Sequence, residues 1–158
     1  WQESKLVDCH RFLAGLFHDA GRVRLDDAYP QAYAKFWEKD LSTEGWILAE
    51  KAAFGIDHTE VGAAILARWE LAEELRRVVT DHHQPAAGLT ETTLRVAAAD
   101  EMLKCPIPDD IREIELIEPE RLDGPCGQLG LVGRAFEDFA ERAQATIVRE
   151  IQFFTPNL

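Results

Sequence analysis

Residues 57–85 read DHTEVGAAILARWELAEELRRVVTDHHQP, and this stretch decides the fold class. Asp57, followed three residues later by Glu60, forms the pattern of a capping box, which opens a helix. A second helix is predicted by apolar residues that recur at helical spacing, namely Leu71, Leu75, Val78 and Val79. This second helix leads directly to the doublet His82-His83. No alternation of the kind that marks a strand occurs here, so the stretch predicts two consecutive helices.

The chain before this stretch shows the same helical spacing. Helices are expected from Asp8 to Asp19, where Gly21 supplies a stop, and then, beyond a polar stretch, over residues 30–41. A further helix is expected from Thr43 to Phe54, because Gly55 is a natural left-handed cap for it.

The chain after this stretch is expected to form two more long helices. Thr90 can cap a helix that runs to Lys104. Proline and glycine then break the chain over residues 106–130, which is loop-like with room for one short helix. A last helix of about 20 residues follows. The sequence therefore predicts one all-α domain, spanning residues 1–158, of about seven or eight helices.

The composition excludes several classes of function. Apolar residues make up 46% of the 158 residues and charged residues 29%, as in a soluble globular domain. No apolar run approaches the roughly 18 residues of a membrane span, and the start lacks a signal-peptide pattern. The net charge of −12 leaves no basic stripe for nucleic-acid phosphates. The three cysteines are widely separated, so we expect reduced thiols in a cytoplasmic protein and no structural zinc.

The first residues of the chain indicate a fragment of a longer protein, or a sequence that lacks a connecting segment. Trp1 stands where an initiator methionine would be. Residues 1–7 look like the start of one helix, and residues 8–11 look like the lead-in to another, with no turn between them. Because two antiparallel helices need a loop, residues are expected to be missing near Val7.

Four of the five histidines, with two aspartates, are residue types that a divalent-metal site in a helical protein would use. His18-Asp19 closes the first helix, where the simpler alternative is a helix cap and a turn bond. His58 stands at a helix start, and taken alone it is better explained as an exposed first-turn residue. His82-His83 ends another helix, and a helix C-terminus also stabilises a protonated histidine without any metal.

Asp100 is the most informative single residue. Its helical neighbours Val96, Ala97 and Leu103 are all apolar, and a carboxylate on an apolar face is costly unless it is paired or metal-bound. Metal ligation and a buried hydrogen bond to a histidine are equally good interpretations. We expect all six residues to converge on one site: His18, Asp19, His58, His82, His83 and Asp100.

Four motifs also stand at a specific combined spacing, although no single one is specific. They are FLAGLFHDAG at 12–21, GIDHTEVG at 55–62, Trp-x-Leu at 69–71 and HHQP at 82–85. Together they closely resemble the HDOD family, the branch of the HD superfamily found in bacterial signalling proteins. The resemblance covers the chain from Trp1 to the early 100s. It implies an HD-type helical bundle, often joined to receiver, diguanylate cyclase or phosphodiesterase domains.

The resemblance also implies a metal site. Active HD hydrolases use an early His, the His-Asp pair, further histidines and a final Asp to hold one or two metals over a phosphate ester. Here His18, Asp19 and Asp100 would be catalytic if the site is active, and His58, His82 and His83 would complete the ligands. Glu3 stands where the family has a histidine, so the site is not standard, although Glu3 offers an oxygen ligand. His10 is a poor substitute, because it lies about 12 Å before His18 on the same helix. The implied cofactor is a divalent metal (Fe, Mn, Ni or Mg), and we expect its occupancy to be partial or absent.

Two functions follow from these residues. The favoured one is a signal-transduction or regulatory module on a degenerate HD scaffold, whose partner is a signalling protein or an attached regulatory domain. The other is a divalent-metal-dependent phosphohydrolase acting on a nucleotide or another phosphate ester. No Gly-Tyr-Pro signature follows His83, which argues against cyclic-dinucleotide hydrolysis, and Ala72 stands where the family usually has proline. Neither nucleic acid nor a membrane is an expected partner.

Overall fold

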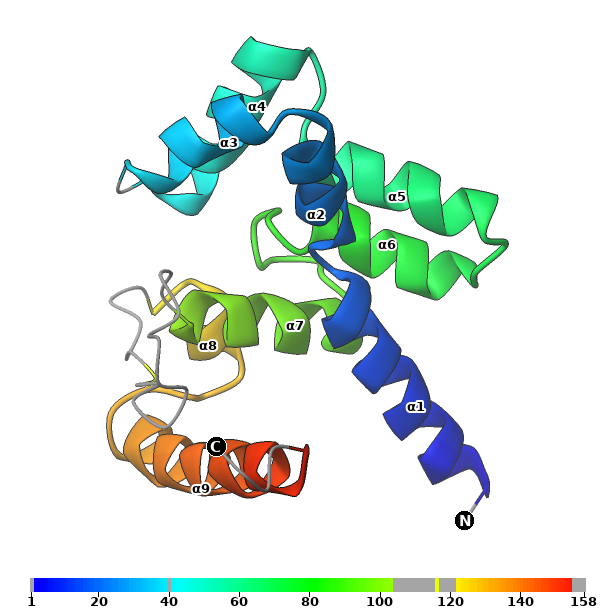
Figure 1. Ribbon diagram of the computed structural model, residues 1–158. Coiled ribbons are helices and arrows are strands. Elements are labelled where there is room, and N and C mark those ends of the chain that lie inside the picture. Colours follow the sequence, from blue (N-terminus) through cyan, green and yellow to red (C-terminus); the bar gives the residue numbers. More distant parts are fainter. Residues whose placement is uncertain (1, 40, 104–115, 117–121, 155–158) are drawn as a thin grey trace. The chain divides into compact units, whose positions relative to one another are not determined.

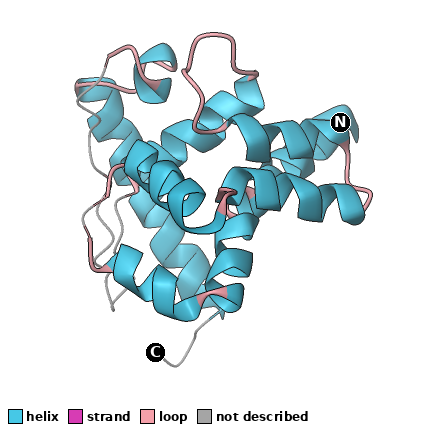
Figure 2. Ribbon diagram, turned by 90° about the horizontal axis from the view of Figure 1, so that it is seen from above, coloured by secondary structure: helices cyan, strands magenta, loops and turns pink. Residues whose placement is uncertain are grey.

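The computed structural model describes residues 2–39, 41–103, 116 and 122–154. Side chains are described within these ranges from Cys9 to Arg149, apart from Thr43 and Val148. Throughout this part of the chain the backbone forms helices, turns and loops, which confirms the all-α prediction (Figure 2). The helices are α1 (Gln2–Phe17), α2 (Ala20–Ala28), α3 (Pro30–Trp37), α4 (Thr43–Phe54), α5 (His58–Arg68), α6 (Glu73–Asp81), α7 (Glu91–Met102), α8 (Pro125–Gln128) and α9 (Arg134–Phe154).

The chain divides into two compact units, residues 1–96 and residues 97–158, with the boundary inside α7. In the first unit, α2 packs against α5, and α5 lies beside α6 (Figure 1). One apolar cluster joins α1, α5, α6 and the start of α7 through Ala14, Leu66, Leu75, Val78, Val79 and Val96. A second cluster joins α2, α3 and α4 through Leu25, Tyr33, Phe36 and Trp46. The single-domain organisation stays a prediction.

The second unit has a small core of its own. Ala98 and Met102 on α7 pack with Cys126 on α8 and Phe136 on α9. The short α8 fits the single short helix expected between residues 106 and 130, and α9, with 21 residues, fits the long last helix. Cys126 is buried and Cys9 is exposed, and both are free thiols.

Local signals in the sequence placed several helix ends correctly. The Asp57 carboxylate accepts from the backbone N–H groups of Thr59 and Glu60, and the Glu60 side chain accepts from the Asp57 N–H at 3.1 Å. This is the predicted capping box. α4 ends at Gly55, whose φ of 73° is the left-handed conformation expected there.

Two expectations about helix ends are wrong. Gly21 does not stop a helix, because it lies inside α2. This helix was not predicted, because its residues are mostly polar. Residue 21 is glycine because α2 crosses α5 so closely that a Cβ at Gly21 would lie 1.9 Å from the His58 carbonyl oxygen. The expected boundary near Val7 is absent as well. α1 is continuous from Gln2 to Phe17, and no glycine or proline stands near Val7 to end it.

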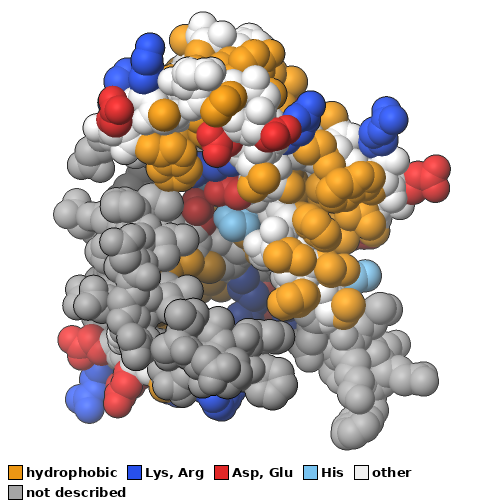
Figure 3. Space-filling model, viewed as in Figure 1, with side chains coloured by type: hydrophobic (Ala, Val, Ile, Leu, Met, Phe, Trp, Pro, Cys, Tyr) orange, Lys and Arg blue, Asp and Glu red, His pale blue; other side chains and the backbone are white. Residues whose placement is uncertain are grey.

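The surface of the first unit carries several exposed hydrophobic side chains (Figure 3). The large ones on or beside α1, α2 and α5 are each more than half exposed: Phe12, Leu16, Val23 and Trp69. Val23 and Trp69 line a shallow groove with Ala20 and Ile65. No helix among the described residues is long and apolar enough to cross a membrane.

Candidate metal centre

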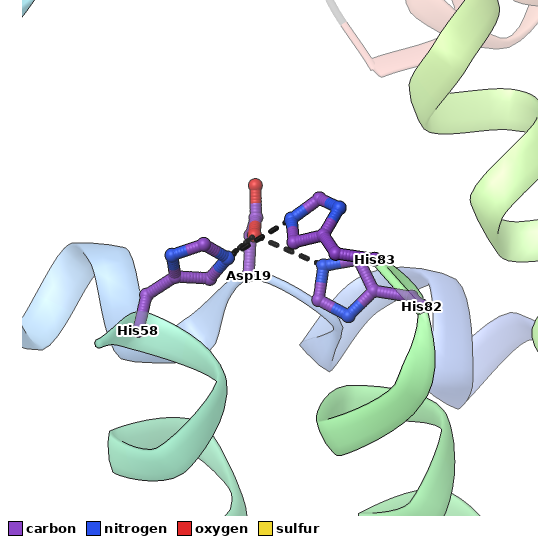
Figure 4. Close-up of side chains that lie close together, drawn as sticks. All are labelled: Asp19, His58, His82 and His83. Carbon is purple, nitrogen blue, oxygen red and sulfur yellow. Dashed lines mark hydrogen bonds and ion pairs between the residues drawn. The ribbon is translucent and has the colours of Figure 1, made fainter. Parts of the chain in front are cut away.

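Four side chains of the first unit meet where α2, α5 and α6 come together (Figure 4). Asp19 occupies the turn between α1 and α2, and His58 is the first residue of α5. His82 caps the C-terminal end of α6, and His83 follows it. One ligand atom from each of the four lies within 4.8 Å of every other. The close crossing at Gly21 therefore brings Asp19 to the start of α5, while the α5–α6 pair brings the two histidines.

Asp19 lies at the centre of this group. Its Oδ1 is 3.5 Å from Nε2 of His58 and 3.6 Å from Nε2 of His82. His83 lies beside His82, with its Nε2 3.0 Å from Nε2 of His58. His58 and His82 are 0% and 2% exposed, whereas the Asp19 side chain keeps 27% of its surface accessible. The group is thus accessible to solvent at Asp19, and His83 is partly exposed as well.

The tautomers of two histidines follow from their hydrogen bonds. Nδ1 of His82 lies 2.9 Å from the carbonyl oxygen of Val79, and Nδ1 of His18 lies 2.7 Å from that of Gly15. A carbonyl oxygen can only accept, so in each ring Nδ1 carries the hydrogen. The neutral ring then keeps its lone pair on Nε2, the nitrogen that faces Asp19.

This arrangement passes a test for a metal site. Among the described residues, Asp19 Oδ1 and His82 Nε2 are both buried and make no hydrogen bond. Both are acceptors, so neither can satisfy the other, whereas a cation between them satisfies both. Imidazole nitrogen and carboxylate oxygen without thiolate are ligands that suit first-row divalent metals. The group could therefore hold a divalent ion.

Arg22 supplies positive charge next to the same carboxylate. Its Nε lies 3.3 Å from Asp19 Oδ1, in ion-pair contact but not aligned for a hydrogen bond, and one terminal nitrogen lies 3.5 Å from Nε2 of His83. The guanidinium also stacks over Trp46. Burial alone would raise the pKa of Asp19, but the positive charge of Arg22 beside the carboxylate favours the ionised form, and the pKa lies well below its usual range. Asp19 is therefore an anion here.

Glu50 was not among the predicted site residues, and it is completely buried on α4 behind His58. Its carboxylate contacts His58 and the hydroxyl of Tyr33. A signal was available, because its helical neighbours are all apolar: Trp46, Ile47, Ala53 and Phe54. The criterion that singled out Asp100 finds Glu50 too. The interpretation of His58 as an exposed first-turn residue is wrong, because its ring is fully buried. Glu50 on α4 contacts the Nδ1 side of that ring.

The remaining predicted site residues are only partly placed. His18 lies beside the group, with Nε2 3.7 Å from Asp19 Oδ2 and its ring edge-on to His82. Asp100 stands on the part of α7 that belongs to the second unit, so its convergence with the histidines stays a prediction. Glu3 belongs to α1, but its side chain is outside the described residues. His10 is exposed on α1.

Comparison with known proteins identifies the family. An uncharacterized protein of Treponema pallidum (strain Nichols) is 31% identical over 75 residues, which is 46% of this chain and 14% of that protein. The chain thus spans only a small part of that relative's length. No solved structure is significantly similar to the chain. The model of the HDOD domain family matches residues 4–85, which is more than half of the chain and includes Asp19, His58, His82 and His83. The chain belongs to the HDOD domain family.

Proposed function

We propose that this chain is a signal-transduction module of the HDOD type in which Asp19, His58, His82 and His83 bind a divalent metal ion. The observation that carries the proposal is the pair of buried, unbonded acceptors, Asp19 Oδ1 and His82 Nε2, that face each other at 3.6 Å. Leaving such groups unsatisfied costs roughly 1–3 kcal/mol each. A bound ion removes that cost and ties α2, α5 and α6 together.

The surroundings of the site favour regulation over catalysis. His58 and His82 are buried, so the site suits a small ion better than a bulky ester. Arg22 already neutralises the one carboxylate of the group. Glu3, in place of the family's early histidine, leaves the ligand set of a hydrolase irregular. The metal would then make the first unit more rigid. A signalling protein or an attached regulatory domain would be the partner that binds this ordered form.

Metal analysis tests the binding directly. Protein purified without chelators is analysed for Fe, Mn, Ni and Mg, and metal-free protein is then titrated with Mn²⁺ while thermal unfolding is followed. At a Mn²⁺ concentration of about 100 Kd, the free energy of unfolding should rise by about 2.7 kcal/mol through mass action. His82→Gln should lose this rise. His10→Gln, which changes an exposed histidine outside the group, should keep it.

A metal-dependent phosphohydrolase is the second candidate. It is favoured by the open side of the group, where Asp19 keeps 27% of its side chain accessible. A bound divalent ion would polarise a phosphoryl oxygen there. Hydrolysis of bis(p-nitrophenyl) phosphate with Mn²⁺ measures this activity, with Asp19→Asn as the control. Metal binding without hydrolysis supports the regulatory module. Hydrolysis that is lost in Asp19→Asn instead supports the metal-dependent phosphohydrolase and contradicts the purely regulatory function.

A further inference from the structure

His58 differs from the other histidines of the site in what holds its ring. His18 and His82 each donate from Nδ1 to the carbonyl of the residue three positions earlier in their own helix, Gly15 and Val79. His58 opens α5, so no earlier turn of its helix supplies such a carbonyl. For the His58 ring to be fixed as the rings of His18 and His82 are, an acceptor outside α5 must bond its Nδ1 hydrogen while Nε2 faces Asp19.

Glu50 supplies that group from α4. Its Oε2 lies 2.6 Å from Nδ1 of His58 and accepts from the backbone N–H of the same residue at 2.8 Å. Its Oε1 accepts from the hydroxyl of Tyr33. All three residues are fully buried. The same oxygen therefore fixes both the main chain and the ring of His58, and Tyr33 occupies the other oxygen.

Both oxygens of the Glu50 carboxylate accept hydrogen bonds, Oε1 from the Tyr33 hydroxyl and Oε2 from the backbone N–H of His58. Because Oε2 is an acceptor, its 2.6 Å contact with Nδ1 of His58 requires the hydrogen on Nδ1.

We propose that Glu50 is a positioning residue that holds a hydrogen of His58 on Nδ1 and directs the Nε2 of that ring toward Asp19 and His83. The orientation of a metal-ligating histidine by a carboxylate on its other nitrogen strengthens metal affinity by about 10–100-fold in known sites. The affinity part of this inference rests on the metal binding proposed above. The tautomer part concerns the metal-free protein and does not.

The test uses two variants and a control on the same helix. Glu50→Leu fills the space but cannot accept, whereas Glu50→Gln can still accept from Nδ1 through its amide oxygen. Glu44→Gln removes an exposed acid from α4 and serves as the control. Nitrogen-15 NMR of the imidazole rings in metal-free protein identifies the protonated nitrogen of His58. Mn²⁺ titration then measures the dissociation constant of each protein.

The wild type, Glu44→Gln and Glu50→Gln should show the hydrogen on Nδ1 alone, and Glu50→Leu should lose this preference and bind Mn²⁺ about 10–100-fold more weakly. A hydrogen on Nε2 of His58 in the wild type overturns the inference, and so does an unchanged tautomer in Glu50→Leu. If Glu50→Leu does not fold, the wild type and Glu50→Gln still test the positioning role of Glu50. A hydrogen on Nε2 of His58 in either protein is enough to reject that role. If the tautomers are as expected but the wild type does not bind Mn²⁺, the proposed metal site is rejected. The positioning role of Glu50 is then kept, because it concerns the metal-free protein.

Discussion

At the scale of single residues, two glycines make the site possible. A Cβ at Gly21 would lie 1.9 Å from the carbonyl oxygen of His58 and 2.7 Å from the backbone nitrogen of Gly62. A Cβ at Gly62 would lie 2.7 Å from a methyl carbon of Val79 on α6. The helices that carry Asp19, His58 and His82 can approach one another only because both positions lack a side chain.

Gly21→Ala should therefore damage both the fold and the site. The new methyl group meets backbone, which cannot rotate away, so we expect a loss of about 3 kcal/mol or more in the free energy of unfolding. Gly15→Ala is the matched control, because nothing lies within 4 Å of its added Cβ and it is exposed on α1. It should be neutral or stabilise the protein by up to about 1 kcal/mol. Urea unfolding of the two variants measures the difference, and equal stabilities would contradict the close crossing of α2 and α5.

Single residues also show why the site was only partly predictable. His18, Asp19, His58, His82 and His83 were identified because their types and spacing are visible in the chain. Glu50 was missed, because its role depends on the contact of α4 with the start of α5, and no local pattern reports that contact. The burial of His58 was missed for the same reason.

At the scale of elements, the start of α5 is held by more bonds than the start of α4. Asp57 accepts from the N–H groups of Thr59 and Glu60 at 2.9 and 3.0 Å and from the Thr59 hydroxyl at 2.7 Å, and Lys51 lies 3.0 Å away. At the start of α4, the Ser42 hydroxyl accepts a single bond from Gly45. Because His58 directly follows Asp57, the cap of α5 also fixes the position of a residue of the candidate metal site.

Asp57→Ala should cost about 2 kcal/mol of unfolding free energy, at the upper end of the usual range for N-caps. Ser42→Ala, which breaks one cap bond on a neighbouring helix, should cost about 0.5–1 kcal/mol. Chemical denaturation followed by circular dichroism gives both values. A loss at Asp57 no larger than the loss at Ser42 would show that the extra bonds of the α5 cap contribute nothing.

Elements with strong end signals were predicted well, and those without were not. α4 and α5 were bounded closely by Gly55 and the capping box, which are local features of the chain. α2 was missed because its residues are mostly polar and Gly21 resembles a stop. Its helical form comes from packing against α5, and packing of that kind overrides local propensity.

At the scale of the whole molecule, the core of the second unit can be tested through its cysteine. Cys126 is buried, with its thiol 3.5 Å from the carbonyl oxygen of Ala98. Burial, with Glu101 beside it, raises the pKa of Cys126 to about 12. The thiolate is the reactive form. At pH 8, iodoacetamide should label the exposed Cys9 readily and Cys126 only after unfolding. Peptide mass spectrometry of Cys105→Ser protein gives both rates, and similar rates would contradict the packing of α7 against α8.

Asp100, in the second unit, had two open interpretations, a metal ligand or a hydrogen-bond partner of a histidine. It is half-buried on α7, and Val96 and Ala97 beside it are buried. If Asp100 bonds a buried histidine, Asp100→Ala should lower the free energy of unfolding by roughly 1–3 kcal/mol, because that histidine is left unsatisfied. The loss should be the same with chelator and with Mn²⁺ if the four residues of the first unit are the only ligands of the proposed metal site.

Thermal unfolding under both conditions decides between the two roles of Asp100. Asp138→Ala, which removes an exposed acid from α9, is the control and should change little. Asp19→Asn should abolish the stabilisation by Mn²⁺ while Asp100→Ala keeps it. If Mn²⁺ stabilises the wild type but not Asp100→Ala, then Asp100 is itself a ligand.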